Sequence, residues 1–479
     1  VNAIRTSHNA PAPELLDLCD RMGLLVQDES FDMWERRKSP YDYARYFAEW
    51  HERDLTDEIL RDRNHASVFM WSIGNEVLEQ WSHADATELD LQAANLILNA
   101  GHAIDPALLK DTTLSRQSLI TRHLAAIVKR LDTSRVVTAG CNEVNPANHL
   151  FRSDALDVLG FNYHEQYLEP FLRNFPGRKL IVSESTSALM TRGYYEMPSD
   201  HIYIRPESWD KPFEAPEHVC SSYDNCHVPW GSTHEKTWHL VKTLPHVSGL
   251  FVWTGFDYLG EPTPYWWPSR SSFFGIVDLA GFPKDVYYMY KSEWTDEPVL
   301  HIFPHWNWKE GERVDIWAYY NNADEVELYL NGKSLGVRQK TDSTYHVSWR
   351  VPFTPGTLRA VSRLGGKEVL VKEIHTAGEP ARLVLTSDLS FVTVDVCDID
   401  GNRVPDATPL IRFSVEGPGE IAGTDNGDPN DPNSLRKPKR QAYYGKALVV
   451  IRNKGGQGDI HLKAIAEGLP EATVTIQAQ

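Results

Sequence analysis

The chain has 479 residues, of which 41% are hydrophobic and 24% charged, and its formal net charge is −18 at pH 7. This length exceeds one ordinary domain, so we expect about two to four. The negative charge argues against nucleic acid as a partner, because phosphates are bound by basic side chains. No apolar run reaches the length of a membrane-spanning helix, so we expect no membrane partner.

Five scattered cysteines fit neither a disulfide framework nor a zinc-binding spacing. Cys220 and Cys226 are close enough in sequence to form a disulfide in an oxidising compartment, although free thiols are the favoured interpretation. The chain opens at Val1 without an initiator Met or a signal peptide, which predicts a piece cut from a longer protein. The compartment stays open between periplasmic or secreted and cytoplasmic.

The first 295 residues alternate short apolar runs with amphipathic helical patterns. Strands are predicted near residues 3, 25, 70, 137, 159, 181 and 251, and helices over 14–22, 41–63, 86–99, 115–132 and 235–243. This alternation predicts a parallel α/β architecture, and a TIM-type (β/α)8 barrel needs one strand more than the seven that are visible. The long connection over 184–236 is interpreted as substrate-pocket architecture, with a surface insertion as the alternative.

Beyond residue 295 the pattern changes to short alternating runs typical of half-buried strands. Strands over 313–319 and 326–330, with a tight turn at Asn331-Gly332, predict an immunoglobulin-like β-sandwich over 296–377. A second β-sandwich is predicted over 378–479, with strands over 389–396, 411–415, 447–451 and 460–466. The barrel would then occupy residues 1–295. Residues 425–439, rich in Asp, Asn and Pro, are predicted to form a mobile loop.

The run Val68-Phe69-Met70-Trp71-Ser72-Ile73-Gly74-Asn75-Glu76 is a buried strand that stops abruptly at Gly74. A carboxylate at the carboxyl end of such a strand lies where barrel enzymes place their chemistry. A helix-capping role is the alternative for Asn75 and Glu76.

The context of this strand carries a specific resemblance. Arg61-Asp62-Arg63-Asn64-His65, followed by Trp71 to Glu76, resembles glycoside hydrolase family 2, the family of β-galactosidases and β-glucuronidases. The resemblance implies that Glu76 is the acid/base and that Glu184, at the end of the strand near 181, is the nucleophile. Asn-Ala-Ile-Arg at residues 2–5 resembles the family's second barrel strand. It implies that the first strand and helix and the family's N-terminal domains are absent from this chain.

A glycosidase of this kind needs two carboxyl groups on opposite sides of one glycosidic bond. The resemblance also implies a set of substrate-binding residues around them, namely Arg5, His8, Asn75, Tyr163, His164 and Trp253. Arg5 would hold the nucleophile, Asn75 the sugar 2-hydroxyl, and Trp253 the floor under the ring. A surface arginine and a turn histidine are the alternatives for Arg5 and His8. Asp28 and Glu29 match a strand-end acidic pair that orients other groups.

Three departures from the family pattern limit what the resemblance implies. Ser30 to Trp34 replace the Glu-x-His of metal-dependent members, and Ser187 stands where some members have His. We therefore expect no cofactor and assign no metal ligands, with a bound metal ion as the alternative. The Asn-x-Lys motif of β-glucuronidases is not found over 271–284, which favours a neutral glycone.

We therefore expect a retaining, exo-acting glycoside hydrolase that cleaves terminal β-D-galactosyl residues from an oligosaccharide or glycoside. Another family 2 β-glycosidase, acting on a modified galactoside, a β-glucuronide or a β-mannoside, is one alternative. A carbohydrate-binding remnant without catalysis is another. A homo-oligomer and a complex with a separate N-terminal fragment stay open as assemblies.

Overall fold

The computed structural model describes residues 1–82, 114–208, 211, 213–215 and 217–478. The chain forms two compact units. Unit 1 consists of Val1–Ser187, Pro206–Pro212 and Val228–Trp253, and unit 2 of Ala188–Arg205, Phe213–His227 and Thr254–Gln479. The helix predicted over 86–99 lies outside the described residues.

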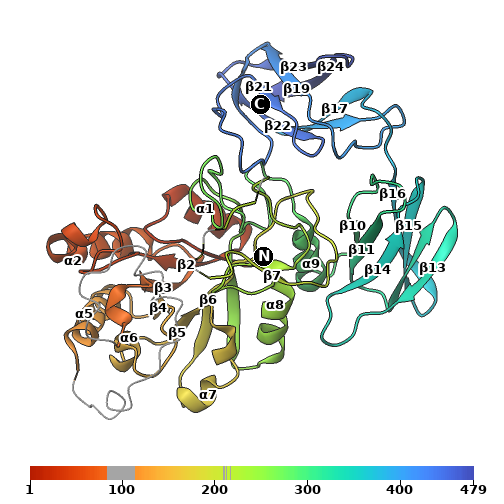
Figure 1. The fold of residues 1–479 in the computed structure, drawn as a ribbon. Helices are drawn as coiled ribbons and strands as arrows, with labels where there is room; N and C mark the ends of the chain where they lie inside the picture. The colour runs from red at the N-terminus through yellow and green to blue at the C-terminus, as the bar shows by residue number, and fades with distance from the viewer. Residues whose placement is uncertain (83–113, 209–210, 212, 216, 479) are drawn as a thin grey trace. The chain divides into compact units, whose positions relative to one another are not determined.

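Unit 1 is built on a parallel sheet that forms a nearly closed TIM-type barrel (Figure 1). In the described part of the chain this sheet has seven strands, in the order β1 (Ala3–Arg5), β2 (Leu25–Glu29), β3 (Val68–Asn75), β4 (Val136–Cys141), β5 (Leu159–Asn162), β6 (Leu180–Thr186) and β9 (Val247–Trp253). Each strand coincides with a predicted one, so the predicted fold is confirmed. The apolar runs were recognisable because parallel strands are buried on both faces.

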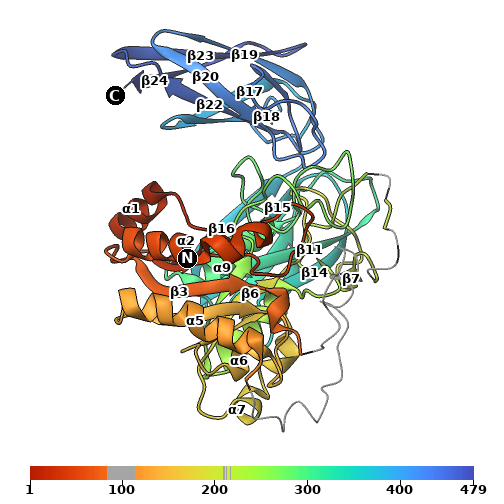
Figure 2. The ribbon, with the colours of Figure 1, turned by 90° about the vertical axis from the view of Figure 1, so that its left-hand side faces the viewer.

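Helices lie on the outside of these strands (Figure 2). They are α1 (Pro13–Met22), α2 (Ala44–Asp62), α5 (Arg116–Leu131), α6 (His149–Arg152), α7 (Phe171–Asn174) and α8 (His234–Thr243), with 3-10 turns η1 (Leu78–Gln80) and η2 (Glu165–Tyr167). Local sequence sets their ends. The Ser115 side chain accepts a hydrogen bond from the Ser118 N–H at the start of α5, and Gly23 ends α1 in the left-handed conformation.

Neighbouring residues on each strand point to opposite sides of the sheet. Val137, Phe161 and Val182 belong to the large core that the helices share with the sheet. Met70, Val158 and Ile181 form a separate small core, which their alternate positions place inside the barrel. Further along the strands, the residues on this inner side become polar or lack a side chain: Arg5, Gln27, Glu29, Ser72, Thr138, Gly140, Gly160, Asn162 and Ser183. The polar layer therefore lies toward the carboxyl ends of the strands.

The first part of unit 2 contains two short strands and a helix, namely β7 (Tyr203–Ile204), β8 (Cys226–His227) and α9 (Asp285–Trp294). Irregular backbone makes up most of the remaining described residues of 187–233, as the sequence predicts. The role of this segment in a substrate pocket stays a prediction. Cys220 and Cys226 are buried free thiols, as are the other cysteines, so the disulfide alternative is not supported.

Residues 300–375 form two packed antiparallel sheets. One has the order β10 (Leu300–Phe303), β11 (Arg313–Tyr320) and β14 (His346–Pro352); the other has the order β13 (Lys333–Arg338), β12 (Glu325–Leu330), β15 (Thr357–Leu364) and β16 (Lys367–His375). Ile316 and Leu328, from opposite sheets, share one core. The turn between β12 and β13 has positive φ at Asn331 and Gly332, as its sequence predicts.

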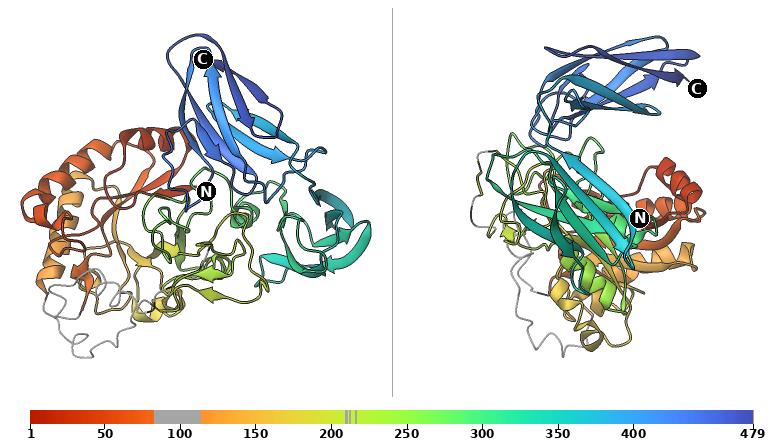
Figure 3. Two further views of the ribbon diagram at one scale, coloured as in Figure 1. Left: turned by 45° about the horizontal axis from the view of Figure 1, so that its top comes forward. Right: turned by 90° about the vertical axis from the view of Figure 1, so that its right-hand side faces the viewer.

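Residues 382–478 form a second sandwich, drawn in blue in Figure 3. Its sheets are β17 (Arg382–Asp388), β18 (Phe391–Cys397), β22 (Lys446–Asn453) and β20 (Gly419–Asp425), and β21 (Lys439–Gln441), β19 (Leu410–Glu416), β23 (Gly458–Ala466) and β24 (Ala472–Ala478). The predicted mobile loop is anchored by a buried ion pair between Arg440 and Asp431 at 2.5 Å. Its mobility stays a prediction, as do the domain boundaries at 295 and 377.

Among the described residues, every helix is too short or too polar to cross a lipid bilayer.

Candidate active site

Arg5 is the centre of the polar layer inside the barrel. Its guanidinium donates to both carboxylate oxygens of Glu29 at 2.9–3.0 Å, to Glu184 Oε2 at 2.6 Å and to Asn75 Oδ1 at 2.7 Å. The side chain is only 4% exposed. Burial alone would lower the pKa of Arg5, but Glu29 and Glu184 raise it above its usual value. One cation thus joins the ends of β1, β2, β3 and β6.

Glu184 lies on β6 and is held on both oxygens. Oε2 pairs with Arg5, and Oε1 accepts a hydrogen bond from the Tyr163 hydroxyl at 2.7 Å. Ser187 donates to the same Tyr163 oxygen at 2.7 Å. Burial and the charge of Glu184 raise the pKa of Tyr163 well above its usual value, so the phenol stays a donor. These bonds fix the orientation of the Glu184 carboxylate.

Glu76 follows β3 directly and meets a different environment. Its backbone N–H donates to the Gly140 carbonyl at 2.7 Å, and Oε1 accepts from Asn162 Nδ2 at 2.9 Å. Burial, together with the charge of Glu184, raises the pKa of Glu76 to about 7. A carboxyl group with this pKa is largely protonated in mildly acidic solution and can donate a proton.

His8 and Trp253 form a parallel aromatic pair beside this network. Their ring centroids are 5.3 Å apart with an interplanar angle of 2°. His8 Nδ1 lies 2.7 Å from Glu29 Oε1, and Nε2 lies 4.0 Å from Glu184 Oε2. The first and last strands of the sheet therefore meet at the same place.

His164 directly follows Tyr163, and its ring contacts Tyr167. Its ring lies edge-on to Tyr167 at a centroid distance of 6.3 Å, and burial lowers its pKa to about 4. The structure connects the other predicted site residues to one another by contacts, and the role of His164 in binding substrate stays a prediction.

The sequence analysis does not predict four polar residues that belong to this hydrogen-bond network: Asn162, Ser72, Asp32 and Lys38. Asn162 Nδ2 donates to Asn75 Oδ1 at 3.0 Å as well as to Glu76, and Ser72 donates to Glu29 at 2.7 Å. Asp32 accepts from Asn75 Nδ2 at 3.0 Å and from Lys38 Nζ at 2.7 Å. Asn162 could have been predicted as a site residue from its position at the end of a strand, just before Tyr163. No feature of the sequence indicates that Lys38 belongs to the site.

Backbone conformation also marks the strand ends. Positive φ angles occur at Glu76, Tyr163, His164, Thr186 and Ser187, immediately after β3 and β5 and at the end of β6. Residues other than glycine seldom adopt this conformation, and such strain is concentrated at functional sites.

Asp28 and Glu29 are adjacent on β2 but lie in opposite surroundings. Burial would raise the pKa of Glu29, but Arg5 lowers it below its usual value. Asp28 faces the other side of the sheet, toward Glu58 and Asp62 of α2. Burial and these two carboxylates raise the pKa of Asp28 to about 9, and burial with Asp62 raises that of Glu58 to about 7. Of the predicted acidic pair, only Glu29 joins the network.

A cavity of about 730 Å³ lies next to this region. Its lining includes His8, Asp32, Tyr43 and Glu58. The expectation of no bound cofactor stays a prediction.

The geometry combines a carboxylate on Glu184 that Arg5 and Tyr163 hold in place with a carboxyl group on Glu76 whose pKa is raised to about 7, both toward the carboxyl ends of barrel strands. Glycosidases use two carboxyl groups with such contrasting properties to break a glycosidic bond. The fold and the site together define a barrel of the glycosidase class.

Comparison with known families agrees with this class. The model of the glycosyl hydrolases family 2 TIM barrel domain matches residues 1–257, and that of the family 2 C-terminal domain 5 matches residues 384–475. A domain of unknown function matches residues 311–370. The chain belongs to glycoside hydrolase family 2.

Individual relatives differ in their stated activities. Beta-galactosidase BoGH2A of Bacteroides ovatus is 59% identical, with all of this chain and 57% of that protein aligned. A putative beta-glucuronidase of Formosa agariphila is 32% identical over 94% of this chain and 42% of its own length. A crystal structure of a beta-glycosidase from Bacteroides vulgatus superposes with a TM-score of 0.83, at 32% identity, over all of this chain and 59% of that one. The chain thus spans about half the length of these relatives.

Gly140 provides the space that Arg5 occupies, so we expect Gly140→Ala to be disruptive. A Cβ atom there would lie 2.8 Å from Arg5 Nη2 and 2.9 Å from Asn162 Oδ1. Overpacking of this kind costs about 1–3 kcal/mol of stability. Urea unfolding should show this loss, whereas the control Gly255→Ala, whose added Cβ meets nothing within 4 Å, should stay within about 0.5 kcal/mol of the parent. Equal stability of the two variants would contradict the tight fit.

The raised pKa of Asp28 predicts a pH dependence of stability. A carboxyl that binds its proton more tightly when folded contributes stability below its unfolded pKa of about 4, and loses it as the pH rises through about 9. The urea midpoint of the parent should therefore fall between pH 5 and pH 9. Asp28→Asn should flatten this decline, leaving the part due to other carboxyl groups with a raised pKa, such as Glu58 and Glu76, and the exposed control Asp17→Asn should not. An unchanged slope in Asp28→Asn would refute the assignment.

Proposed function

We propose that the protein is a retaining, exo-acting glycoside hydrolase in which Glu184 is the nucleophile and Glu76 the acid/base. The observation that carries this proposal is the contrast between the two carboxyl groups. Glu184 is bound by Arg5 and Tyr163, whereas the pKa of Glu76 is raised to about 7 by burial and by the charge of Glu184. A nucleophile must be an oriented anion, and a general acid must carry a proton.

The reaction would proceed by double displacement. Glu184 attacks the anomeric carbon while Glu76 gives its proton to the departing glycosidic oxygen, which leaves as an alcohol. The sugar is then bound covalently to Glu184. Glu76, now a carboxylate, takes a proton from a water molecule that attacks the same carbon and releases Glu184. Two inversions give a product with the configuration of the substrate.

The surrounding residues would orient the groups that react. Asn75 Oδ1 accepts from Arg5 and Asn162, and one hydrogen of Nδ2 is donated to Asp32. The second Nδ2 hydrogen would then bind the sugar 2-hydroxyl, a contact that strengthens in the transition state. Trp253, stacked on His8, would offer its ring to the apolar face of the sugar.

Two observations favour a β-D-galactosyl group as the sugar that is cleaved. The Bacteroides ovatus relative with 59% identity is named a beta-galactosidase. Both cations of the network are already paired, Arg5 with Glu29 and Glu184, and Lys38 with Asp32. A uronate carboxylate would have to compete with these carboxylates for either cation, so a neutral sugar fits better.

We expect 4-nitrophenyl β-D-galactoside to be the best substrate of the complete protein. Its kcat/KM should exceed those of the β-glucuronide and the β-mannoside at least about a hundredfold, because a site built to bind particular hydroxyls rejects analogues that misplace them. Initial rates of nitrophenol release measure this directly. If the glucuronide or the mannoside were hydrolysed faster than the galactoside, the assignment of galactose as the cleaved sugar would be wrong. If none of the three were hydrolysed, a carbohydrate-binding remnant without catalysis would be favoured.

The roles of the two carboxyl groups can be separated by azide rescue. Glu76→Ala should still form the glycosyl-enzyme from substrates with good leaving groups, and azide should intercept it to give the β-glycosyl azide. Glu184→Gly leaves a hole beneath the anomeric carbon, so azide should attack directly and give the α-glycosyl azide. NMR of the products reports the anomer.

The exposed control Glu14→Ala should hydrolyse at the parental rate with no azide product. The assignment of acid/base and nucleophile fails if both variants give the same anomer. It also fails if neither variant responds to azide while circular dichroism shows that each is folded.

A further inference from the structure

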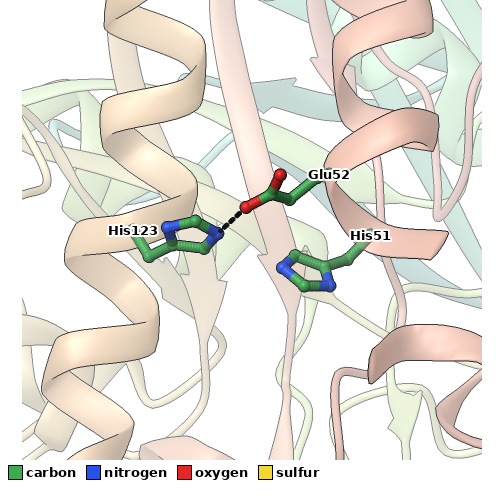
Figure 4. A group of neighbouring side chains, drawn as sticks. All are labelled: His51, Glu52 and His123. Atoms are coloured by element: carbon green, nitrogen blue, oxygen red, sulfur yellow. Dashed lines mark ion pairs between the residues drawn. The ribbon is translucent and has the colours of Figure 1, made fainter. Parts of the chain in front are cut away.

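Three side chains that could bind a metal lie together on neighbouring helices of unit 1. His51 and Glu52 belong to α2 and His123 to α5, and one ligand atom from each lies within 4.8 Å of the others. Figure 4 shows the imidazoles and the carboxylate converging between the two helices. None of the three belongs to the network around Glu76 and Glu184, so the group has no role in the proposed reaction.

His51 is held in the form that a metal requires. Its Nδ1 lies 2.6 Å from the Phe47 carbonyl oxygen, so Nδ1 carries the hydrogen and Nε2 keeps its lone pair. The ring also stacks on Phe47 with centroids 4.7 Å apart and an interplanar angle of 13°. In Figure 4 one ring nitrogen of His51 points toward the other two residues. A backbone carbonyl that fixes the ring in this way is the usual outer contact of a metal-bound histidine.

Glu52 and His123 supply the other two ligand atoms. His123 Nε2 lies 3.0 Å from Glu52 Oε1, and the rings of His123 and His51 are 5.4 Å apart at 67°. The side chains of His123 and Glu52 are 46% and 62% exposed, so an ion can reach them from solvent. An exposed ion pair contributes little to stability by itself, and a metal would take the place of the hydrogen between the two groups.

We propose that His51, Glu52 and His123 bind one divalent transition metal ion of the zinc type and so link α2 to α5. Two imidazoles and one carboxylate suit Zn²⁺ and not Mg²⁺ or Ca²⁺, which prefer oxygen ligands. Ligand atoms around a tetrahedral zinc ion lie about 3.4 Å apart, so the exposed side chains must approach by about 1–2 Å. Water completes the coordination.

The test uses the complete protein after removal of metals with a chelator. Isothermal titration with Zn²⁺ should show saturable binding, and Zn²⁺ should raise the thermal unfolding midpoint because the three ligands are brought together only in the folded state. Co²⁺ at the same site should give the strong visible absorption of four-coordinate cobalt, and Mg²⁺ should give no saturable binding here.

Matched variants assign this binding to the site. His123→Gln and Glu52→Gln should each weaken Zn²⁺ binding at least about tenfold and abolish the cobalt spectrum, since the loss of even an outer contact of a ligand costs about 10–100-fold. Glu49→Gln, also exposed on α2, and His461→Ala, exposed on β23, should bind Zn²⁺ as the parent does. Absence of saturable binding by the parent, or parental binding by both site variants, would overturn the proposal. Glycoside hydrolysis is measured separately and does not bear on it.

Discussion

The pairing of Arg5 is the constraint on which the rest of the barrel interior depends. A buried guanidinium is tolerated only if its hydrogens meet carboxylates or other acceptors, because an unpaired buried charge is very costly. Arg5 meets this need with Glu29, Asn75 and Glu184, which come from three different strands. Gly140, the residue without a side chain beside it, gives the guanidinium its space. The polar layer, the strand register and the orientation of Glu184 therefore all serve to pair the buried guanidinium of Arg5.

The sequence predicts the barrel strands correctly for a physical reason, and the roles of the two carboxyl groups stay a proposal. Strands buried on both faces are visible as apolar runs, and Glu76 and Glu184 stand where two of those runs end. Asn162 and Lys38 were missed because their partners are set by strand register and loop path, which single-sequence patterns do not encode. The same limit applies to Asp28 and Glu29, which are neighbours in the sequence but point to opposite sides of the sheet.

The sequence does not predict some of the helices. Helices α6 and α7 have four residues each, too few to show a helical period, and α9 lies in a stretch where aromatic residues dominate on every side. Residues 425–439 were predicted to be mobile from their composition. The buried pair of Arg440 with Asp431 could not be foreseen, because a charged residue in such a stretch normally faces water.

The spacing of the Arg5 partners along the chain has a consequence for how the protein acquires its site. Glu29 is 24 residues from Arg5, whereas Glu184 is 179 residues away. Closing the shorter loop costs less chain entropy, so the Arg5–Glu29 pair can form early and neutralise the cation while the barrel is still open. Contact with Glu184 must wait until β6 docks. We therefore expect the site to be completed late in folding, because a growing chain that ends before β6 lacks Glu184.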